Sequence, residues 1–279
     1  MGFRDISVCV SSISPDHDLV DQAAAIAENW NAHLSCCAIG VQPMPVFVDG
    51  FGSTQTDVSM MIQASSEELR AFRSDLHRHI EQKTPSVEFR HTMNFINGLA
   101  QVTSLFARYA DILIARMPDR PDTALHSEII EGALFGAGRP VLAVPKNWKP
   151  RAIGERVLLA WDASREASRA IHSALPVLKT NAEVCIVTVD AHTGPTEHGD
   201  VPGLDIAAHL ARHDLRVTVR NEDSLGKAVG ERLIEAANGF NADMIIMGAY
   251  RRPRLLQRIT GGPSQLMLTR SPLPVLMSH

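Results

Sequence analysis

One block of sequence occurs twice in this chain, and the repetition limits the folds that the chain can adopt. Residues 110–114 read Ala-Asp-Ile-Leu-Ile, and residues 242–246 read Ala-Asp-Met-Ile-Ile. Each block is followed, after a similar interval, by a short aliphatic segment that begins with proline, at residues 140–144 and 274–277. Features that recur in the same order at near-constant spacing indicate a duplicated structural unit. The sequence therefore predicts two copies of one domain.

Each copy alternates short aliphatic segments with helix-like segments. The expected strands cover residues 6–10, 34–41, 87–95, 112–115 and 140–144 in the first copy, and 156–161, 183–189, 215–221, 244–247 and 274–277 in the second. This alternation favours parallel strands joined by right-handed helical crossovers. We therefore predict an α/β fold of two doubly wound, five-stranded parallel-sheet domains, at residues 1–146 and 154–279, with ligand sites at the carboxyl ends of the strands.

Composition and charge narrow the classes of function. The net charge of −4 argues against a general nucleic-acid binder. No apolar run approaches the ~18 residues of a membrane span, and the first residues lack the pattern of a secretory signal, so we expect a cytoplasmic protein without membrane contact. Reduced, buried thiols are expected at all four cysteines, which are Cys9, Cys36, Cys37 and Cys185. Residues 42–57 are expected to form a loop that covers the first sheet or packs on a partner.

Asp162 is the first candidate for a ligand contact. It follows the first expected strand of the second copy, in the segment Ala160-Trp161-Asp162-Ala163-Ser164. A carboxylate at the end of a strand lies at the rim of the crevice, where it could accept hydrogen bonds from an adenine amino group or from ribose hydroxyls. The alternative is structural, because Asp162 or Ser164 could equally cap the helix that follows.

A second candidate follows the fourth strand of the same copy. Gly248 lets the chain turn near the sheet, and Gly261 and Gly262 precede the next helix, where free amides and the helix dipole favour an anion. Four arginines lie between these glycines, namely Arg251, Arg252, Arg254 and Arg258. The combination predicts a phosphate site, although no Walker A motif occurs. The alternative is a solvated basic loop with a glycine turn.

These residues carry a resemblance to a known family. The repeated α/β units, the Ala-Asp strand and the closing Pro-Val-Leu strand resemble the universal stress protein family. The segment 243–279 is similar to the family's G-x2-G-x9-G-[ST] nucleotide loop with its following helix and last strand. The resemblance covers both copies and implies a five-stranded parallel sheet in each domain, pairing of the two domains through their last strands, and ATP binding in some members.

The resemblance assigns roles to positions of the second copy. Gly248 matches the first glycine of the loop and Gly261 the third, while Arg251 replaces the second. Gly262 stands at the hydroxyl position, and Ser264 supplies the next hydroxyl. The resemblance also implies that Asp162 contacts adenine and that Val189, at the end of the second strand, packs near the base. Arg251 could contact phosphate or fill the pocket.

The first copy departs further from the family pattern. Ser11 stands where the second copy has Asp162, and Arg116 stands where it has Gly248. The loop after Arg116 contains carboxylates that would repel a triphosphate and lacks the phosphate glycines. The sequence therefore predicts no nucleotide site of the family type in the first domain, which would serve as a structural or regulatory partner.

Other chemistries are less well supported by the sequence. His192, His198, His209 and His213 could together bind zinc, and His209 and His213 share one helical face. However, no His-Glu-x-x-His motif occurs and no cysteine joins them, so we expect no metal site. No Gly-x-Ser-x-Gly nucleophile elbow is present, and we therefore expect no dedicated enzyme.

These features lead to one leading hypothesis and two alternatives. The leading hypothesis is a cytoplasmic stress-response protein of tandem domains that binds ATP or another adenine nucleotide in its second domain and regulates unknown protein partners. Under this hypothesis, the two domains of one chain pair with each other, a homodimer is a further option, and no nucleic-acid partner is expected. The first alternative is an interaction module with a degenerate site that Arg251 fills. The second is a weak ATP-hydrolysing enzyme.

Overall fold

The computed structural model describes residues 2–42, 55–83, 86–118, 123–194, 198–249 and 262–279. In the first half the elements are β1 (Asp5–Ser11), α1 (His17–Trp30), β2 (His33–Gln42), α2 (Gln55–Lys83), β3 (Glu88–Phe95), η1 (Ile96–Gly98), α3 (Leu99–Ala107), β4 (Ile112–Arg116), α4 (Thr123–Glu131), the π-helical η2 (Gly132–Ala137) and β5 (Val141–Val144). Strands occupy all five places predicted for them in this half. The loop expected at residues 42–57 lies mostly outside the described residues.

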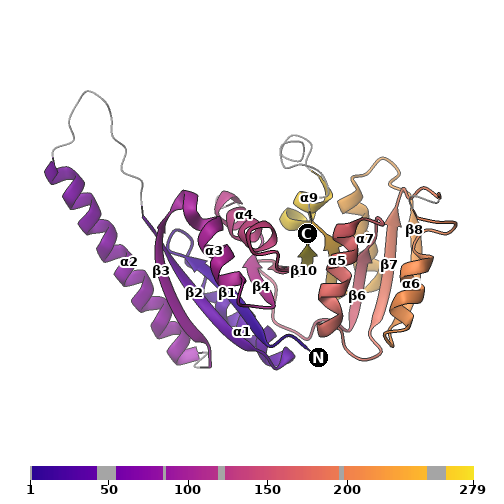
Figure 1. Cartoon of the computed structure of the whole chain (residues 1–279), viewed down its shortest axis with the longest axis horizontal. Coiled ribbons are helices and arrows are strands. Elements are labelled where there is room, and N and C mark those ends of the chain that lie inside the picture. Colours follow the sequence, from indigo (N-terminus) through magenta and orange to yellow (C-terminus); the bar gives the residue numbers. More distant parts are fainter. Residues whose placement is uncertain (1, 43–54, 84–85, 119–122, 195–197, 250–261) are drawn as a thin grey trace.

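The second half repeats the same order of strands. Its elements are β6 (Arg156–Ala160), α5 (Arg165–Ala174), η3 (Leu175–Val177), β7 (Glu183–Val189), α6 (Leu204–Ala211), β8 (Arg216–Glu222), α7 (Val229–Phe240), β9 (Met244–Gly248), α9 (Pro263–Arg270) and β10 (Val275–Ser278). All five predicted strands of this half are confirmed. The α/β class follows from the strand–helix alternation visible along the chain (Figure 1).

The strands of both halves form one ten-stranded sheet. Its order is β3-β2-β1-β4-β5-β10-β9-β6-β7-β8, so the two halves meet at the pair β5–β10. That pair is antiparallel, with Leu142 opposite Leu276 and Ala143 opposite Val275. The other neighbouring strands of the described sheet are parallel. Pairing of the two halves through their last strands, which the family resemblance implied, is confirmed.

The repeated aspartate has a structural role in both halves. The Asp111 carboxylate accepts hydrogen bonds from the backbone amides of Arg4 and Asp5, at 2.7 and 3.1 Å. The Asp243 carboxylate likewise accepts from the three amides of residues 154–156, at 2.8–2.9 Å. Each aspartate thereby ties the beginning of the first strand of its half to the fourth strand. This contact explains why the Ala-Asp block recurs.

Helices cover both faces of the sheet and bury two aliphatic cores. One core packs α1, α2, α5 and α6 on one face, and the other packs α3, α4, α7 and α9 on the opposite face. Both cores cross the seam between the halves. Leu142 and Leu276 belong to the first core, while Ala143 and Val275 belong to the second. The sheet is therefore buried on both faces at its centre, as its continuous aliphatic strands require.

The four cysteines are free and buried, as the sequence predicted. Burial raises the pKa of the Cys36 and Cys37 thiols well above the ordinary value. The nucleophilic thiolate is therefore disfavoured at both positions, and these two residues serve as core side chains. In the described part of the chain, no helix has the length and apolar character needed to cross a membrane.

Candidate functional site

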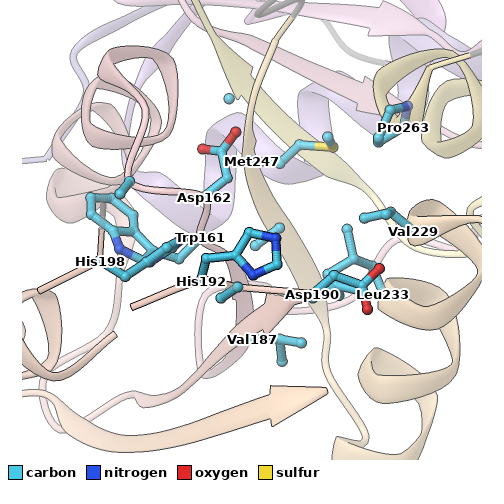
Figure 2. A pocket seen from close by; sticks show the side chains of 15 residues that line it. Trp161, Asp162, Val187, Asp190, His192, His198, Val229, Leu233, Met247 and Pro263 are labelled. Atoms are coloured by element: carbon cyan, nitrogen blue, oxygen red, sulfur yellow. The ribbon is translucent and has the colours of Figure 1, made fainter. Parts of the chain in front are cut away.

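A pocket of about 380 Å³ opens at the carboxyl ends of the second-half strands. Residues after β6, β7 and β9 form its base, and the N-terminal ends of α7 and α9 supply its far side. Figure 2 shows Asp162 on one side of this space and Val229 and Pro263 on the other. This location is the one expected for ligands in open α/β sheets. We refer to it as the second-half pocket.

Asp162 lines the second-half pocket and is exposed to solvent. The cap of α5 is Ser164, whose hydroxyl oxygen accepts a hydrogen bond from the Ala167 amide at 3.1 Å. Asp162 in turn accepts hydrogen bonds from the Ser164 amide, at 3.1 Å, and from the Ser164 hydroxyl. The two roles considered from the sequence, ligand contact and helix cap, therefore fall to different residues. Ser164 performs the capping, and Asp162 supports the cap while it faces the pocket.

The turn that presents Asp162 has an unusual backbone. Ala163 adopts a left-handed conformation with φ of 55° and also lines the pocket. For a residue with a Cβ atom this conformation costs roughly 1–2 kcal/mol. Strained residues of this kind cluster at functional sites. The local backbone thus stabilises a particular direction of the Asp162 carboxylate at the expense of an ordinary turn.

Apolar side chains form the inner wall of the pocket. Val189, the residue that sequence reasoning placed beside a base, lies at the end of β7 and lines this wall. Val187 and Met247 are buried beside it, and Val229 and Leu233 approach from α7 (Figure 2). A flat wall of this composition suits the apolar faces of an aromatic ring. In the sequence, this apolar wall is indicated by the aliphatic residues at the end of each strand.

Gly248 ends β9 and lies directly beneath the first turn of α5. A Cβ atom at this position would come within 2.6 Å of the Ala167 backbone nitrogen and 2.7 Å of the Glu166 carbonyl carbon. The glycine is therefore required for the close approach of α5 to the sheet, and not solely for a phosphate. Gly248 also lines the second-half pocket.

Replacement of Gly248 by alanine is expected to destabilise the protein by about 1–3 kcal/mol, because the added methyl group overpacks backbone atoms that cannot move alone. The control is Gly239→Ala near the end of α7, where a Cβ would meet no atom within 4 Å. That change should be neutral or stabilise by up to about 1 kcal/mol. Urea denaturation of both variants tests the pair. Equal stabilities would contradict the steric role of Gly248.

The phosphate end of the predicted site is described in part. Gly262 precedes α9, which begins with Pro263, and Pro263 lines the pocket. Ser264 lies in the first turn of α9 and is buried. Arg251 and Gly261 lie outside the described residues, as do the other three arginines of the loop. The described structure therefore brings Asp162, Val189 and Gly248 to one pocket and places the start of α9 at its edge.

Two histidines and a second aspartate also line the pocket. Asp190 follows β7, and His192 and His198 come from the segment after it (Figure 2). The Ser224 amide donates a hydrogen bond of 2.8 Å to Asp190, and this contact lowers the pKa of the carboxyl group. Sequence reasoning considered these histidines only as metal ligands. Their place in the pocket could have been inferred from their position after the second strand of this half, at the same edge of the sheet as Val189.

The other two histidines of that group lie elsewhere. His209 lies in the last turn of α6, whereas His213 lies in the turn beyond the end of that helix at Ala211, so the prediction that both share a helical face is wrong. Their ring centroids are nevertheless 4.8 Å apart. His172 on α5 lies 5.2 Å from His209. Burial and the neighbouring His213 and His172 lower the pKa of His209. Within the residues that the structure describes, no group of three or more histidine, cysteine, aspartate or glutamate side chains could hold a metal ion.

A buried arginine stands at the corresponding strand end of the first half. Arg116, the counterpart of Gly248, is 2% exposed and donates to both carboxylate oxygens of Asp16, at 2.6 and 2.9 Å. Its other terminal nitrogen donates to the Gln22 side chain and to the Pro145 carbonyl, each at 2.9 Å. These contacts form a buried polar cluster at the first-half position that corresponds to Gly248. We call this group the Arg116 cluster.

Comparisons with known proteins were made for sequence and for structure. Residues 154–279 match the sequence model described as "Universal stress protein family". The whole fold is similar to a universal stress protein from Archaeoglobus fulgidus DSM 4304, with a TM-score of 0.67, 16% identity, and coverage of 98% of this chain and 95% of that one.

A second solved structure is similar over the same length. It is a putative universal stress protein from Pseudomonas aeruginosa UCBPP-PA14, with a TM-score of 0.52 and 15% identity. The alignment covers 99% of this chain and 93% of that one. At such identities these likenesses establish the fold. A search of curated proteins finds no significant match.

Proposed function

We propose, since residues 154–279 belong to the universal stress protein family, that the second half of this chain binds an adenine nucleotide in the second-half pocket. The observation that carries the proposal is the convergence of Asp162, Val189 and Gly248 on one pocket at the carboxyl edge of the sheet. Val189 and Gly248 are the last residues of β7 and β9, and Asp162 lies just beyond the end of β6. A pocket of this volume falls in the usual range of roughly 300–1,000 Å³ for small-molecule sites.

Each part of the pocket has a role in this proposal. Val189 and its aliphatic neighbours contact the base, and Asp162 accepts hydrogen bonds from the adenine amino group or the ribose hydroxyls. The phosphates extend towards Gly262 and Ser264 at the start of α9, where the helix dipole favours anions. Arg251 and Gly261 complete the phosphate end, and ATP is the expected ligand. A metal ion has no role in the proposal.

At the level of the whole chain, we propose two universal-stress-like domains over residues 1–146 and 154–279. The second holds the nucleotide, and the first is its structural or regulatory partner. The chain acts in the cytoplasm by binding, and nucleotide occupancy alters its affinity for a protein partner or for a second copy. No chemical step is assigned to the pocket.

The first test is the nucleotide content of the natively purified protein. Nucleotide released on denaturation is identified by chromatography, and ATP, AMP and adenosine are titrated by calorimetry. We expect ATP to bind, and to bind more tightly than adenosine if the start of α9 holds phosphate. Absence of released nucleotide together with absence of heat at millimolar ATP would overturn the proposal.

The second test is Asp162→Ala. Hydrogen bonds to a charged group contribute about 1.5–3 kcal/mol, so the affinity for ATP should fall by roughly 10- to 100-fold. The matched control is Asp205→Ala, which removes an exposed carboxylate from α6 outside the pocket lining. Calorimetry should show wild-type affinity for that control. Equal affinities of the two variants would mean that Asp162 only supports the Ser164 cap.

One observation favours the alternative of a module without nucleotide. Among the described residues that line the pocket, none is lysine or arginine, while two are aspartates. The negative charge of a triphosphate would therefore have to be balanced by the N-terminal end of α9 and by Arg251. If Arg251 instead fills the pocket, Arg251→Ala should create ATP binding that the wild type lacks. Sustained phosphate release, lost in Asp162→Ala, would indicate the hydrolytic alternative.

A further inference from the structure

A second pocket, unrelated to the proposed nucleotide site, lies at the outer edge of the first half. It has a volume of about 330 Å³ and is formed by α2 on one side and by β2 and β3 on the other. Figure 1 shows that α2 lies close to β3 near its C-terminal end and diverges from it towards its N-terminal end. We call this space the α2–β3 groove.

The floor of the groove is apolar. Leu69 is buried at 8% exposure, and Phe72 packs partly against the core. Met93 on β3 is 52% exposed although it lies beside them. Gly40 keeps the floor open, because a Cβ atom there would come within 3.1 Å of Leu69 and 3.4 Å of Met93. An unbranched apolar group could therefore cover Met93 and remove it from water, which is favourable.

The rim of the groove carries basic side chains without carboxylate partners. Arg70 and Arg73 on α2 and His91 on β3 line the groove. In the described part of the chain, neither arginine is in an ion pair. By contrast, Arg78 on the same helix pairs with Asp75 at 3.4 Å. Since no aspartate or glutamate lines the groove, its rim is complementary to an anion.

One contact at the rim shows how the basic groups are placed. The Arg73 Nη1 atom lies 3.1 Å from His91 Nε2. A guanidinium group can only donate, so His91 Nε2 is the acceptor in this contact. This partner does not balance the charge of Arg73. An anionic head group at this rim would accept hydrogen bonds from Arg73 and also form an ion pair with it.

From these observations we propose that the α2–β3 groove binds a small amphiphilic anion, of the class of medium-chain carboxylates. Its apolar chain lies on Leu69, Phe72 and Met93, and its head group accepts hydrogen bonds from Arg70 and Arg73. The apolar chain of this ligand matches the floor of the groove, and its anionic head group matches the basic rim. The proposal stands independently of nucleotide binding, because the groove shares no residue with the second-half pocket.

The test uses decanoate as the ligand and decanol as its neutral counterpart, titrated into the full chain by calorimetry. Decanoate should bind saturably at one site, and decanol should bind roughly tenfold or more weakly, because its neutral hydroxyl group forms neither an ion pair nor a bidentate contact with an arginine. Saturating ATP should leave decanoate binding unchanged. Equal binding of decanoate and decanol, or no binding of decanoate, would overturn the proposal.

Variants locate the site. In the double variant Arg70→Gln/Arg73→Gln, the affinity for decanoate should fall about tenfold or more while that for decanol stays the same. Arg78→Gln is the matched control, since it removes an exposed arginine of the same helix outside the groove. All three positions are exposed, so the variants should keep the wild-type melting temperature. Unchanged decanoate affinity in the double variant would overturn the assignment, as would displacement of decanoate by an acidic peptide at lower concentration.

Discussion

Replacement of Arg116 by methionine is expected to reduce the free energy of unfolding by about 3–5 kcal/mol, which is typical of breaking a buried ion pair from one side. The variant would leave the Asp16 carboxylate, itself 17% exposed, without its guanidinium partner. The Gln22 oxygen and the Pro145 carbonyl would each lose a hydrogen bond of 2.9 Å. Methionine keeps an unbranched chain in place of the aliphatic stem of arginine, so loss of packing would be small compared with loss of polar contacts.

Two further variants separate the contributions to this effect. Arg165→Met removes an arginine that is 67% exposed and pairs with Glu166 at 2.8 Å, and should cost less than about 1 kcal/mol. Arg116→Lys keeps the charge but not the planar fork that binds both oxygens of Asp16, and should be intermediate. Urea denaturation measures all three. Equal losses for Arg116→Met and Arg165→Met would refute the structural role of the Arg116 cluster.

The same cluster predicts a dependence of stability on pH. Burial acts to raise the pKa of Asp16, but hydrogen bonds and charge from Arg116, together with the Leu19 amide, outweigh it and lower the pKa. Since the folded pKa lies below the unfolded value of about 3.9, the stabilisation is present above that value and is lost as pH falls through the folded pKa. The difference in unfolding free energy between wild type and Arg116→Met should therefore shrink below about pH 4.

A second large effect is expected at the seam of the sheet. Leu276 on β10 is fully buried opposite Leu142 on β5. Leu276→Ala should reduce the free energy of unfolding by about 2–5 kcal/mol, from lost burial and from the cavity that remains. Leu142→Ala should have a similar cost. Because the two side chains face one another, the double variant should lose less than the sum of the single losses.

The seam also determines how many transitions the unfolding shows. Both cores extend across β5 and β10, so we expect the two halves to unfold together in one cooperative transition. Probes in both halves test this, with Trp148 fluorescence compared with the signal from Trp161 in single-tryptophan variants. Two separate transitions, with Leu276→Ala shifting only one of them, would show that the halves are energetically independent.

Much of the fold could be predicted because the strands are unusually clear in this sequence. The runs that became β4, β6 and β9 are aliphatic on both faces, and such runs are typical of central parallel strands. The repeated Ala-Asp block fixed the equivalence of the halves, and Asp111 and Asp243 perform the same structural task. The pairing of the two halves through their last strands, by contrast, was implied by the family resemblance and by no local pattern, and its antiparallel orientation is seen only in the structure. The sequences of short strands such as β5 and β10 do not indicate which other strand pairs with them.

The candidate site was harder to predict in full. Asp162 and Gly248 stand at strand ends, where position alone indicates the crevice. His192 and His198 come from the irregular segment after β7, and nothing in their spacing reveals which way that segment folds. The role of Arg116 could not be read from the sequence, because it depends on Asp16 from α1 and on the Pro145 carbonyl from beyond β5. Contacts between such distant parts of the chain appear only in three dimensions.

The seam has a consequence for the order of events during synthesis on the ribosome. Ala143 of β5 pairs with Val275 of β10, and nearly the whole second half lies between them in the chain. Domains generally fold from the N-terminus as they are made, so the first half emerges with the outer edge of β5 unpaired. An exposed, apolar strand edge is a template for pairing with other chains. The nascent protein therefore passes through an interval in which chaperone protection of β5 matters most, and synthesis of β10 ends that interval.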